Sequence, residues 1–331
     1  MVTVGGGGPA GAAAALAALG EGESVRILDR ALFPRHKVCG EFLSPESLAV
    51  LESLGAAQLV LDRRPAWMRR VRLVMGAREK TAALSEPAPG ISRYALDALL
   101  LDEARRRGAV LLRGEARGLN APAVQATGRG AHAAQAGAKG ARLFGFKAHF
   151  AGPLSDAVEL YFWRGCYVGV NPVEDGLTNV CGLAPQAALA AVDFDVDALL
   201  EQAGPAVRER LAPLRRQWDW IRTGPLVFAR RRTAAGLPEG IYPAGDTLSF
   251  VDPFTGSGQL CALVTGRLAG RAAAHRLPLD QYMAGADRAL GRAARVSGAI
   301  RRLLAAGAPG WLAEWAPIPA LYRWTRPQLG L

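Results

Sequence analysis

The sequence predicts an α/β protein in which a helix-flanked parallel sheet is interrupted by an antiparallel β-sheet and followed by C-terminal helices. Two observations predict this fold. The first thirty residues have the order strand, glycine turn, helix, strand, which is a βαβ opening. Residues 143–183 then change to alternating, aromatic-rich sequence that is typical of antiparallel strands. Half of the 331 residues are hydrophobic, which is enough for a sizeable core.

The N-terminal elements begin with an apolar strand over Met1–Val4, an alanine-rich helix that ends near Leu19, and a buried strand over Ser24–Asp29. A loop rich in proline, glycine and charge follows from Phe33 to Pro45. Glycines end the two helices that come next. The other expected elements of this region are a helix over Glu46–Leu54, a strand over Val71–Met75, a helix over Leu96–Arg107 and a third parallel strand over Ala109–Leu112.

The second half of the chain returns to the first unit after the antiparallel sheet. Ala116–Ala141 is rich in glycine and alanine with weak periodicity, so we expect a compact connector there, and Val192–Leu214 is mostly helical. Ile241–Asp246 predicts an apolar strand, and Thr255–His275 predicts a glycine turn followed by a helix. The expected domains are residues 1–140 together with 236–331, and an inserted domain over 141–235.

Charge and cysteine content argue against two classes of partner. The net charge is +11, but the arginines are scattered rather than clustered beside base-stacking aromatics, so we expect no nucleic acid. The four cysteines include no CxxC pair, so we expect no metal site. No apolar run reaches the roughly 18 residues of a membrane span. We therefore expect a cytoplasmic protein with reduced thiols.

Gly6, Gly8 and Gly11 match the pattern G-x-G-x-x-G between the first strand and the first helix. The first glycine allows the tight turn, the second lets a pyrophosphate approach the backbone, and the third lets helix and sheet pack closely. The helix N-terminus then presents free N–H groups and positive potential to the phosphates. Asp29 ends the second strand, where a carboxylate accepts hydrogen bonds from ribose hydroxyls. The sequence therefore predicts a dinucleotide site, without separating NAD from FAD.

Further segments carry a family resemblance that favours FAD over NAD. They are Asp29-Arg30, Phe33-Pro34-Arg35, Lys37-Val38-Cys39-Gly40-Glu41, Ile91-Ser92-Arg93, Ala244-Gly245-Asp246 and Asp252-Pro253-Phe254-Thr255-Gly256-Ser257-Gly258. Together they resemble FAD-dependent oxidoreductases of the p-hydroxybenzoate-hydroxylase fold, and within it the geranylgeranyl-reductase-like branch. The resemblance spans most of the chain. It implies a Rossmann-type FAD-binding domain with an inserted antiparallel β-sheet substrate domain.

The resemblance also implies roles for the matching residues. The glycine turn would hold the pyrophosphate, Asp29 the ribose, Asp246 the ribityl chain or pyrophosphate, and the Gly256–Gly258 backbone the anionic edge of reduced flavin. The residues expected to bind FAD are Gly6, Gly8, Pro9, Ala10, Gly11, Asp29, Arg30, Arg35, Cys39, Gly40, Arg93, Gly245, Asp246, Pro253, Gly256, Ser257 and Gly258.

The sequence departs from this family in its middle. The family's Asp-Gly motif, which is linked to NAD(P)H use, is Thr127-Gly128 here, so the acid is missing and the electron donor stays open between NAD(P)H and another reductant. Cys39 and Glu41 are the catalytic candidates, because the Lys-x-Cys-Gly loop of the branch lies beside flavin and substrate. For each, the alternative is a structural role: loop packing for Cys39, and a surface or capping carboxylate near Ser44-Pro45 for Glu41.

The aromatic residues of the predicted insert would give an apolar pocket for a hydrophobic or polyketide-like substrate. Strand alternation requires about half of them to point away from it, and ordinary sheet core is the alternative. The expected lining residues are Phe146, His149, Tyr161, Trp163, Tyr167 and Asn171.

Several reactions remain open. The wider family favours hydroxylation by reduced flavin and oxygen, which we place first, whereas the Cys39 loop favours hydride transfer to a carbon–carbon double bond. Trp218-Asp219-Trp220-Ile221 is similar to the W-x-W-x-I motif of flavin-dependent halogenases, with Lys80 as the nearest candidate lysine. A non-catalytic FAD-binding protein is a further alternative.

The C-terminal region predicts an arginine-rich amphipathic helix over Leu290–Leu304, followed by Trp311, Trp315 and Trp324. Such a segment would either cap the first domain or rest on a membrane surface. Peripheral membrane contact is therefore an expectation alongside the cytoplasmic location.

Overall fold

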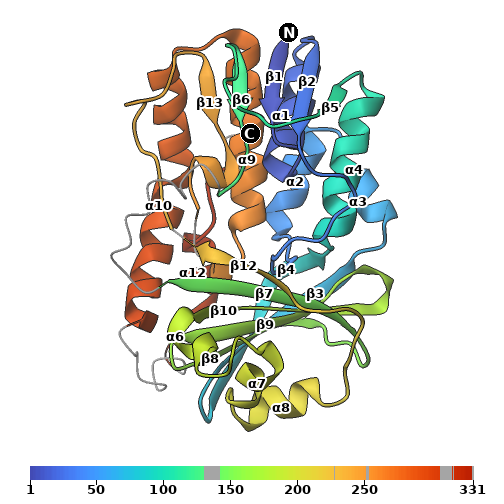
Figure 1. Ribbon diagram of the computed structural model, residues 1–331, viewed down its shortest axis with the longest axis vertical. Coiled ribbons are helices and arrows are strands. Elements are labelled where there is room, and N and C mark those ends of the chain that lie inside the picture. The colour runs from blue at the N-terminus through green and yellow to red at the C-terminus, as the bar shows by residue number, and fades with distance from the viewer. Residues whose placement is uncertain (130–141, 227, 251–252, 306–314, 316, 330–331) are drawn as a thin grey trace.

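The computed structural model describes residues 1–129, 142–226, 228–250, 253–305, 315 and 317–329. Its described strands form two sheets that lie one above the other along the long axis (Figure 1). The upper sheet carries the N-terminus and is flanked by helices, and the lower sheet is larger. The predicted α/β class is confirmed. In the described part of the chain, no helix combines the length and apolar character needed to cross a membrane.

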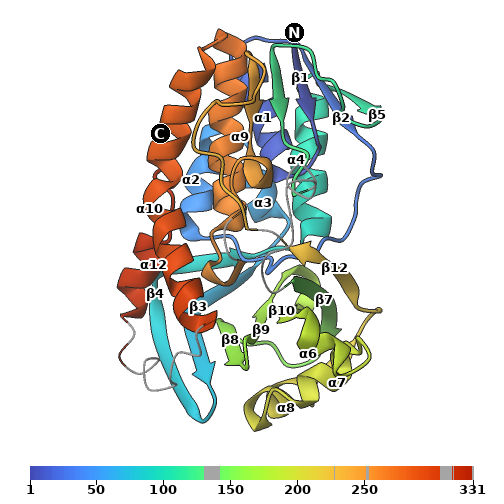
Figure 2. The same cartoon turned by 60° about the vertical axis from the view of Figure 1, so that its left-hand side comes forward.

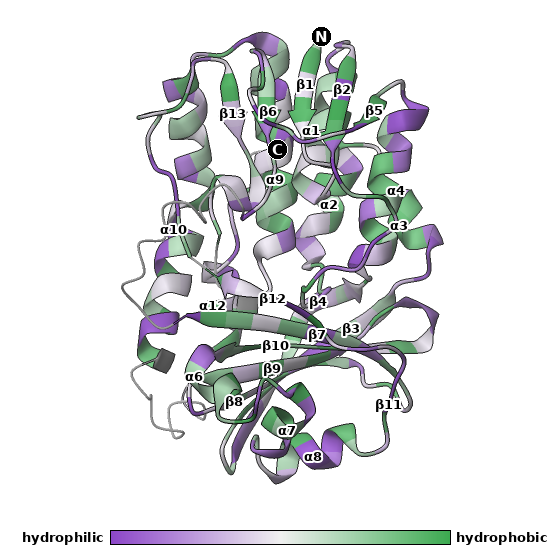
Figure 3. Ribbon diagram, viewed as in Figure 1, coloured by the Kyte–Doolittle hydropathy of each residue, from purple (hydrophilic) through white to green (hydrophobic). Residues whose placement is uncertain are grey.

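The upper sheet consists of parallel strands in the order β13-β6-β1-β2-β5. The chain direction across the sheet reverses at β1, and in such sheets ligands bind at the carboxyl ends of the strands beside that reversal. The strands are β1 (Val2–Gly5), β2 (Val25–Asp29), β5 (Val110–Arg113), β6 (Ala123–Gln125) and β13 (Ile241–Pro243). Hydrophobic colouring dominates β1 and β2, as expected of buried parallel strands (Figure 3).

Strand β6 adds a paired strand to the compact connector predicted over residues 116–141. It lies between β1 and β13 and pairs with both. A three-residue strand is too short to show periodicity, so its pairing with distant strands defines it rather than its own sequence. Residues 130–141 of the predicted connector lie outside the described residues.

Helix α1 (Pro9–Gly20) packs closely against α9 (Gly258–His275). A Cβ at Gly266 would lie 2.2 Å from the Ala10 carbonyl oxygen, and a Cβ at Gly270 would lie 2.2 Å from that of Ala14. These glycines therefore let the two helices approach more closely than larger residues would. The other helices of this unit are α2 (Pro45–Ser53), α3 (Ala57–Asp62), α4 (Arg93–Arg106), α10 (Leu279–Ala305) and α12 (Ile318–Trp324).

The lower sheet has the order β11-β7-β10-β9-β8-β3-β4, with β12 also paired to β7. Its pairs are antiparallel except β3 with β8, which is parallel. The strands are β3 (Ala66–Met75), β4 (Arg78–Gly90), β7 (Leu143–Ala151), β8 (Ala157–Trp163), β9 (Cys166–Pro172), β10 (Leu177–Pro185), β11 (Arg215–Arg216) and β12 (Ile221–Leu226).

The β3–β4 hairpin belongs to the lower sheet, whereas the predicted domain boundaries assign it to the first domain with the upper sheet. Residues 66–90 fall within the predicted first domain, yet they complete the lower sheet through the register Val71 to Val158. Figure 2 shows this hairpin extending below the helices beside α12. The reason is that pairing between segments more than eighty residues apart leaves no trace in local sequence pattern.

The two faces of the lower sheet have different neighbours. Phe146, Phe150 and Tyr161 lie in a buried cluster that also contains residues of α7 (Val196–Glu201) and α8 (Pro205–Leu211). These two short helices replace the single helical region predicted over 192–214. The remaining short elements are α6 (Gln186–Ala190) and the 3-10 turns η1 (Glu174–Gly176), η2 (Gly245–Thr247) and η3 (Pro253–Thr255).

The arginine-rich helix predicted over Leu290–Leu304 corresponds to α10, which is longer because it starts at Leu279. Beyond it, Trp315 and Trp324 are strongly exposed, at 78% and 43%. Trp311 lies outside the described residues.

Candidate active site

A pocket of about 540 Å³ lies between the carboxyl ends of the upper-sheet strands and the lower sheet. Its walls come from the glycine turn, the 35–42 loop, residues 114–117 and 125–129, strands β9 and β10, and the turn before α9. Most of the residues predicted to bind FAD line it: Gly6, Gly8, Pro9, Ala10, Asp29, Arg30, Arg35, Cys39, Gly40, Arg93, Gly245, Asp246, Gly256 and Gly258.

The three glycines of the first turn have different structural roles. Gly6 has a φ of +106°, and a Cβ there would lie 2.2 Å from the Ala126 carbonyl oxygen. A Cβ on Gly11 would lie 1.7 Å from the Gly6 carbonyl oxygen, so Gly11 supports the turn from behind and does not line the pocket. Gly8 has ordinary extended backbone, and its Cβ would meet only Arg93 Nη2 at 3.5 Å. Gly8 therefore keeps the pocket side of the turn open.

Gly8 is also the N-cap of α1 and provides no side-chain cap. The first N–H groups of the helix are therefore available to a ligand on the pocket side. At the neighbouring strand end, Asp29 accepts hydrogen bonds from the N–H groups of Gly7, at 2.7 Å, and Ala31, at 2.8 Å. Arg35 lies 3.7 Å from the same carboxylate. These contacts fix the Asp29 carboxylate at the edge of the pocket.

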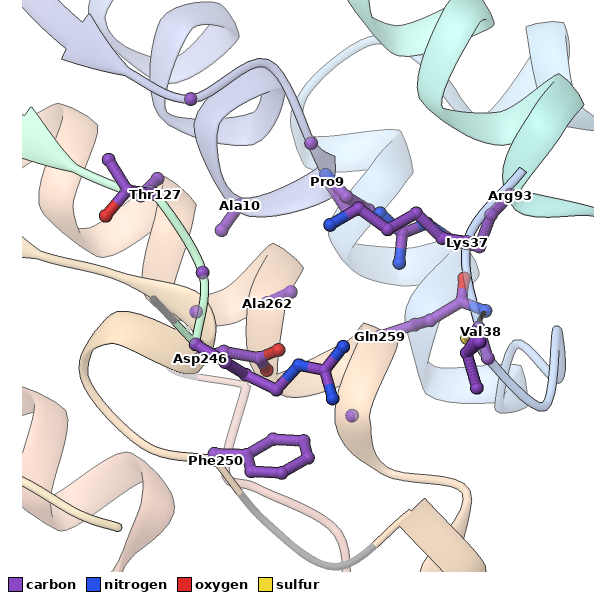
Figure 4. Close-up of a pocket in the computed structure, with 18 of the residues that line it drawn as sticks. Pro9, Ala10, Lys37, Val38, Arg93, Thr127, Asp246, Phe250, Gln259 and Ala262 are labelled. Carbon is purple, nitrogen blue, oxygen red and sulfur yellow. Dashed lines mark hydrogen bonds between the residues drawn. The ribbon is translucent and has the colours of Figure 1, made fainter. Parts of the chain in front are cut away.

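Six basic residues of the described chain line the pocket: Arg30, Arg35, Lys37, Arg93, Arg117 and Arg129. Figure 4 shows Lys37 and Arg93 beside Pro9 at the start of α1, and Asp246 with Phe250 at the opposite wall. Burial, followed by the charges of the neighbouring arginines, lowers the pKa of Lys37 to about 8. Burial lowers the pKa of Arg129 as well. Concentrated positive charge of this kind favours a ligand with phosphate groups.

Lys37 and Arg129 were not among the residues predicted to bind the cofactor. Lys37 is part of the quoted Lys-x-Cys-Gly segment, so its sequence position was informative. Arg129 follows Thr127-Gly128 directly, and Gly128 exchanges hydrogen bonds with the Thr247 hydroxyl, at 3.0 and 3.1 Å. Arg129 itself stacks 5.3 Å from the Phe250 ring centroid. This position depends on β6, which the sequence pattern did not reveal.

The turn before α9 forms the other end of the pocket. Gly256 has a φ of +63°, and Ser257 is the N-cap of α9 without a side-chain cap, which leaves helix N–H groups available. Arg326 donates to the Thr255 carbonyl at 3.0 Å and so holds the turn from outside. Ser257 is buried behind the turn and does not line the pocket. The side chain of Pro253, which was also predicted to bind FAD, lies outside the described part of the structure.

The residues present fit a dinucleotide such as FAD. Two uncapped helix N-termini face one pocket, the α1 turn keeps an open glycine at Gly8, and a carboxylate stands at the β2 end. Such a donor set would hold a ribose at Asp29, a pyrophosphate at Gly8 and Lys37, and an anionic ring edge at Gly256–Gly258.

The Cys39 loop forms the wall between the two sheets. The Cys39 sulfur accepts hydrogen bonds from the Glu41 N–H and from Gln259 Nε2, both at 3.4 Å. Asn179 Nδ2 donates to the Cys39 carbonyl at 3.2 Å. Both contacts to the sulfur use it as an acceptor, so neither consumes its S–H proton. Gln259 is the second residue of α9 and lines the pocket (Figure 4). The sequence offered no signal for its role.

Glu41 is the centre of a buried polar network. Its Oε1 accepts from Lys147 Nζ and, at 2.6 Å, from the Arg93 N–H. Its Oε2 lies 2.5 Å from His149 Nε2. Burial alone would raise the pKa of Glu41, but Lys147 and His149 outweigh burial and hold the pKa below its usual value. Glu41 is therefore an ionised carboxylate inside the protein, and its predicted alternative as an exposed cap does not apply.

Of the six residues predicted to line a substrate pocket, the described lining contains Tyr167. Phe146, Tyr161 and Trp163 pack instead in the cluster on the far face of the sheet, because strand alternation points them away. His149 belongs to the Glu41 network, and Asn171 is buried and donates to the Pro172 carbonyl at 3.3 Å. The pocket's apolar wall comes from Val38, Phe42, Tyr167, Leu183 and Leu226.

The halogenase-like features lie outside the pocket. Lys80 lies on β4, opposite Leu73, and is not part of the lining. Trp220 packs against Phe146 and Phe150 on the far face of the sheet. Trp218 contacts His36 and His149.

Comparison with known proteins gives sequence relatives for part of the chain. No family model matches. The chain is 36% identical over 108 residues to the menaquinone reductase of Mycobacterium tuberculosis H37Rv. It is 49% identical over 63 residues to the menaquinone reductase of Mycolicibacterium smegmatis. The first match covers 32% of this chain and 26% of the relative, and the second covers 19% and 15%. These matches therefore span about a quarter or less of the relatives' length.

Comparison of structures covers nearly the whole chain. A triple mutant of the flavin-dependent brominase Bmp2 superposes with a TM-score of 0.77 at 18% identity, over 97% of both chains. A flavoprotein/dehydrogenase from Cytophaga hutchinsonii gives 0.75 at 18% identity, over 98% of this chain and 93% of the other. The halogenase PltM, solved with phloroglucinol and FAD, gives 0.75 at 17% identity, over 94% and 78%. At these identities the likeness establishes the fold.

Proposed function

We propose that this chain binds FAD and is an FAD-dependent oxidoreductase. The observation that carries the proposal is that the Gly8 turn, the basic residues and the uncapped α9 N-terminus all line one pocket. The menaquinone reductase relatives and the flavoprotein fold support it. Since the matched sequence covers a minor part of those relatives, their activity enters here as a proposal.

The proposal predicts a pH dependence of FAD binding. The Lys37 ammonium has its pKa lowered from 10.5 to about 8, so the free protein releases that proton above about pH 8. A bound pyrophosphate favours the charged ammonium, so FAD binding above that pH takes up a proton. We expect FAD affinity to fall by up to about tenfold per pH unit between about pH 8 and 10.

Flavin fluorescence titration measures this affinity, with Lys37→Gln as the comparison. The variant should bind FAD more weakly and without the alkaline decline. The stability of the apoprotein changes with pH in the opposite direction to its FAD affinity. Between about pH 8 and 10.5 the unfolded chain binds more protons at Lys37 than the folded chain does. The free energy of unfolding of the apoprotein therefore rises with pH in this range. A variant whose affinity declines like the wild type would place the titrating group elsewhere.

For the reaction, we propose reduction of a carbon–carbon double bond rather than hydroxylation, which the wider family resemblance favours. Bound flavin would supply the hydride. Reduction then requires one proton at the second carbon, and the chain places a thiol and a buried carboxylate network at the pocket wall. Cys39 is positioned by Gln259 and by the Glu41 N–H. Lys147 and His149, which pair with the Glu41 carboxylate, carry exchangeable protons next to this loop.

The substrate class follows from the lining and from the relatives. The apolar wall has few polar groups, which fits a hydrophobic small molecule. The name menaquinone reductase indicates a quinone with a hydrophobic chain, and we propose a substrate of that class. The two-electron donor that reduces the flavin is proposed to be NAD(P)H or another soluble reductant, since Thr127-Gly128 lacks the acid of the family motif.

An anaerobic mixing experiment tests the proposed reaction. The FAD-loaded protein is reduced with NADPH, NADH or dithionite and mixed with a short-chain menaquinone, with absorbance and product mass recorded. We expect flavin reoxidation together with a product that keeps two additional hydrogen atoms after reoxidation in air, which converts any quinol back to the quinone. A long-lived oxygen adduct after mixing with aerated buffer instead would restore hydroxylation, and an absence of FAD binding would overturn the whole proposal.

Replacing Cys39 with serine tests the thiol. We expect the rate of double-bond reduction to fall by about 100-fold, because serine is a far weaker acid in the same position. FAD affinity and the rate of flavin reduction by the donor should stay close to wild type. Cys166→Ser provides the matched control, since Cys166 lies in the cluster on the far face of the sheet. Equal loss in both variants would assign Cys39 a packing role.

A further inference from the structure

Three ring nitrogens behind Glu41 are buried without a hydrogen-bond partner among the described residues. They are His149 Nδ1, His36 Nδ1 and Trp218 Nε1. Buried polar atoms are nearly always paired, so three orphans in one place need a functional or structural reason. Their residues are not part of the described pocket lining, whereas Glu41 is.

The three rings touch one another. The His36 and His149 ring centroids are 5.5 Å apart in an edge-to-face arrangement. Trp218 lies 4.8 Å from His36 and 5.0 Å from His149, so it covers both. His36 also stacks on Tyr94 at 4.7 Å. The polar atoms are thus confined to a small space bounded by aromatic faces.

This cluster leads from the protein interior to the surface. Glu41 is fully buried and His149 is buried against it. His36 is half-buried, and Tyr94, which stacks on it, is 44% exposed. The titratable and charged groups that face these rings are Glu41 and His36 from the 35–42 loop, and Lys147 and His149 from β7.

We propose that His149 and His36 form a proton path that connects the buried Glu41 network with solvent. The inference rests on the proposed function, because double-bond reduction consumes one proton in the pocket at each turnover. When the Glu41 network gives up a proton to the pocket, His149 replaces it by releasing the proton on Nε2 to Glu41 Oε2. His149 then takes up another proton at Nδ1 from the side of His36, and His36 regains one from solvent. One proton therefore enters the network for each that leaves it.

The surroundings of His36 suit this role. Burial, and then the charges of Lys147 and His149, lower the pKa of His36, so its ring is neutral at neutral pH. A neutral imidazole has one donor and one acceptor nitrogen and can pass a proton from one to the other. Trp218 would exclude bulk water from the path, which gives the first tryptophan of the W-x-W segment a role unrelated to halogenation.

Nuclear magnetic resonance tests the path without turnover. The chain has four histidines, so selective ¹⁵N-histidine labelling gives a tractable spectrum. We expect exchange of the His149 Nε2 proton with water to slow by at least about tenfold in His36→Phe, which keeps the aromatic packing but has no ring nitrogen. His275→Phe is the matched control, because His275 is exposed and pairs with Glu21. Its spectrum should show wild-type exchange at His149.

A second variant, His36→Gln, guards against loss of packing, and both variants should slow the exchange. In the FAD-loaded protein, His36→Phe should also lower the rate of the proton-dependent step, with partial rescue by added imidazole. Wild-type exchange rates in both His36 variants would overturn the proposal. The labelled apoprotein gives this answer even if no FAD binds, so failure of the path and failure of the proposed function are distinguishable.

Discussion

Replacing Lys147 with methionine should lower the free energy of unfolding by about 3 to 5 kcal/mol at neutral pH. Lys147 is fully buried and pairs with Glu41, which is also fully buried. Methionine fills a similar volume but leaves the carboxylate with His149 and the Arg93 N–H as its remaining partners. An uncompensated buried charge costs far more than the pair contributes. Urea denaturation followed by tryptophan fluorescence measures the change.

The same pair predicts the sign of a pH effect. In the wild type the folded-state pKa of Glu41 is below 4.5, so its contribution to stability is present above the unfolded pKa and is lost as pH falls through the folded one. Without Lys147, burial raises the pKa of Glu41 in the folded state. The destabilisation should therefore shrink as the pH is lowered toward about 5.

Two comparisons complete this test. The double variant Glu41→Gln with Lys147→Met should recover much of the loss, since it removes both charges. Lys80→Met on the edge strand β4 should change stability by no more than about 0.5 kcal/mol. Two results would show that the Glu41–Lys147 pair does not cause the loss of stability. One is a double variant whose loss equals the sum of the losses of the single variants, and the other is an equal loss for Lys147→Met at neutral pH and at about pH 5.

Replacing Gly8 with valine should weaken FAD binding by at least about 100-fold, equivalent to about 2.7 kcal/mol, while the apoprotein stays folded. The Gly8 backbone is extended with a φ of −75°, and a Cβ there meets only the Arg93 guanidinium at 3.5 Å. The new side chain therefore fits the free protein but occupies the space that a pyrophosphate would need. Flavin fluorescence titration and thermal unfolding measure the two effects separately.

Gly20 and Gly11 provide the matching comparisons. Gly20 ends α1 with nothing within 4 Å of its Cβ position, so Gly20→Val should leave FAD affinity unchanged. Gly11→Ala should instead destabilise the apoprotein, since its Cβ would collide with the Gly6 carbonyl oxygen at 1.7 Å. If Gly8→Val bound FAD normally, the α1 N-terminus would not be the phosphate site.

The part of the site that sequence could predict is the part built by neighbouring residues. The Gly6–Gly11 turn, Asp29 and the Cys39 loop owe their positions to contiguous segments with defined chemistry. They border the pocket, except that Gly7 and Gly11 of the turn are not part of its lining. Their spacing alone determines how they would meet a nucleotide. Local sequence was therefore sufficient to predict a site residue wherever a single turn or strand end determines its position.

The rest depends on contacts between distant segments. Glu41 meets Lys147 and His149 only because β7 lies against the 35–42 loop, a juxtaposition across more than a hundred residues. Alternation correctly indicated that half of the aromatic set would face away, but it did not indicate which half. That choice is fixed by the register of β7 and β10, which a single sequence does not encode locally.

The placement of the β3–β4 hairpin has a consequence for how the chain folds. The backbone passes between the sheets after β2, returns after β4, leaves again after β6 and returns after β12. Neither sheet is made of one continuous stretch, so no single cut yields two halves that each retain all of their strands. With so many pairings between segments remote in sequence, the chain is expected to fold slowly.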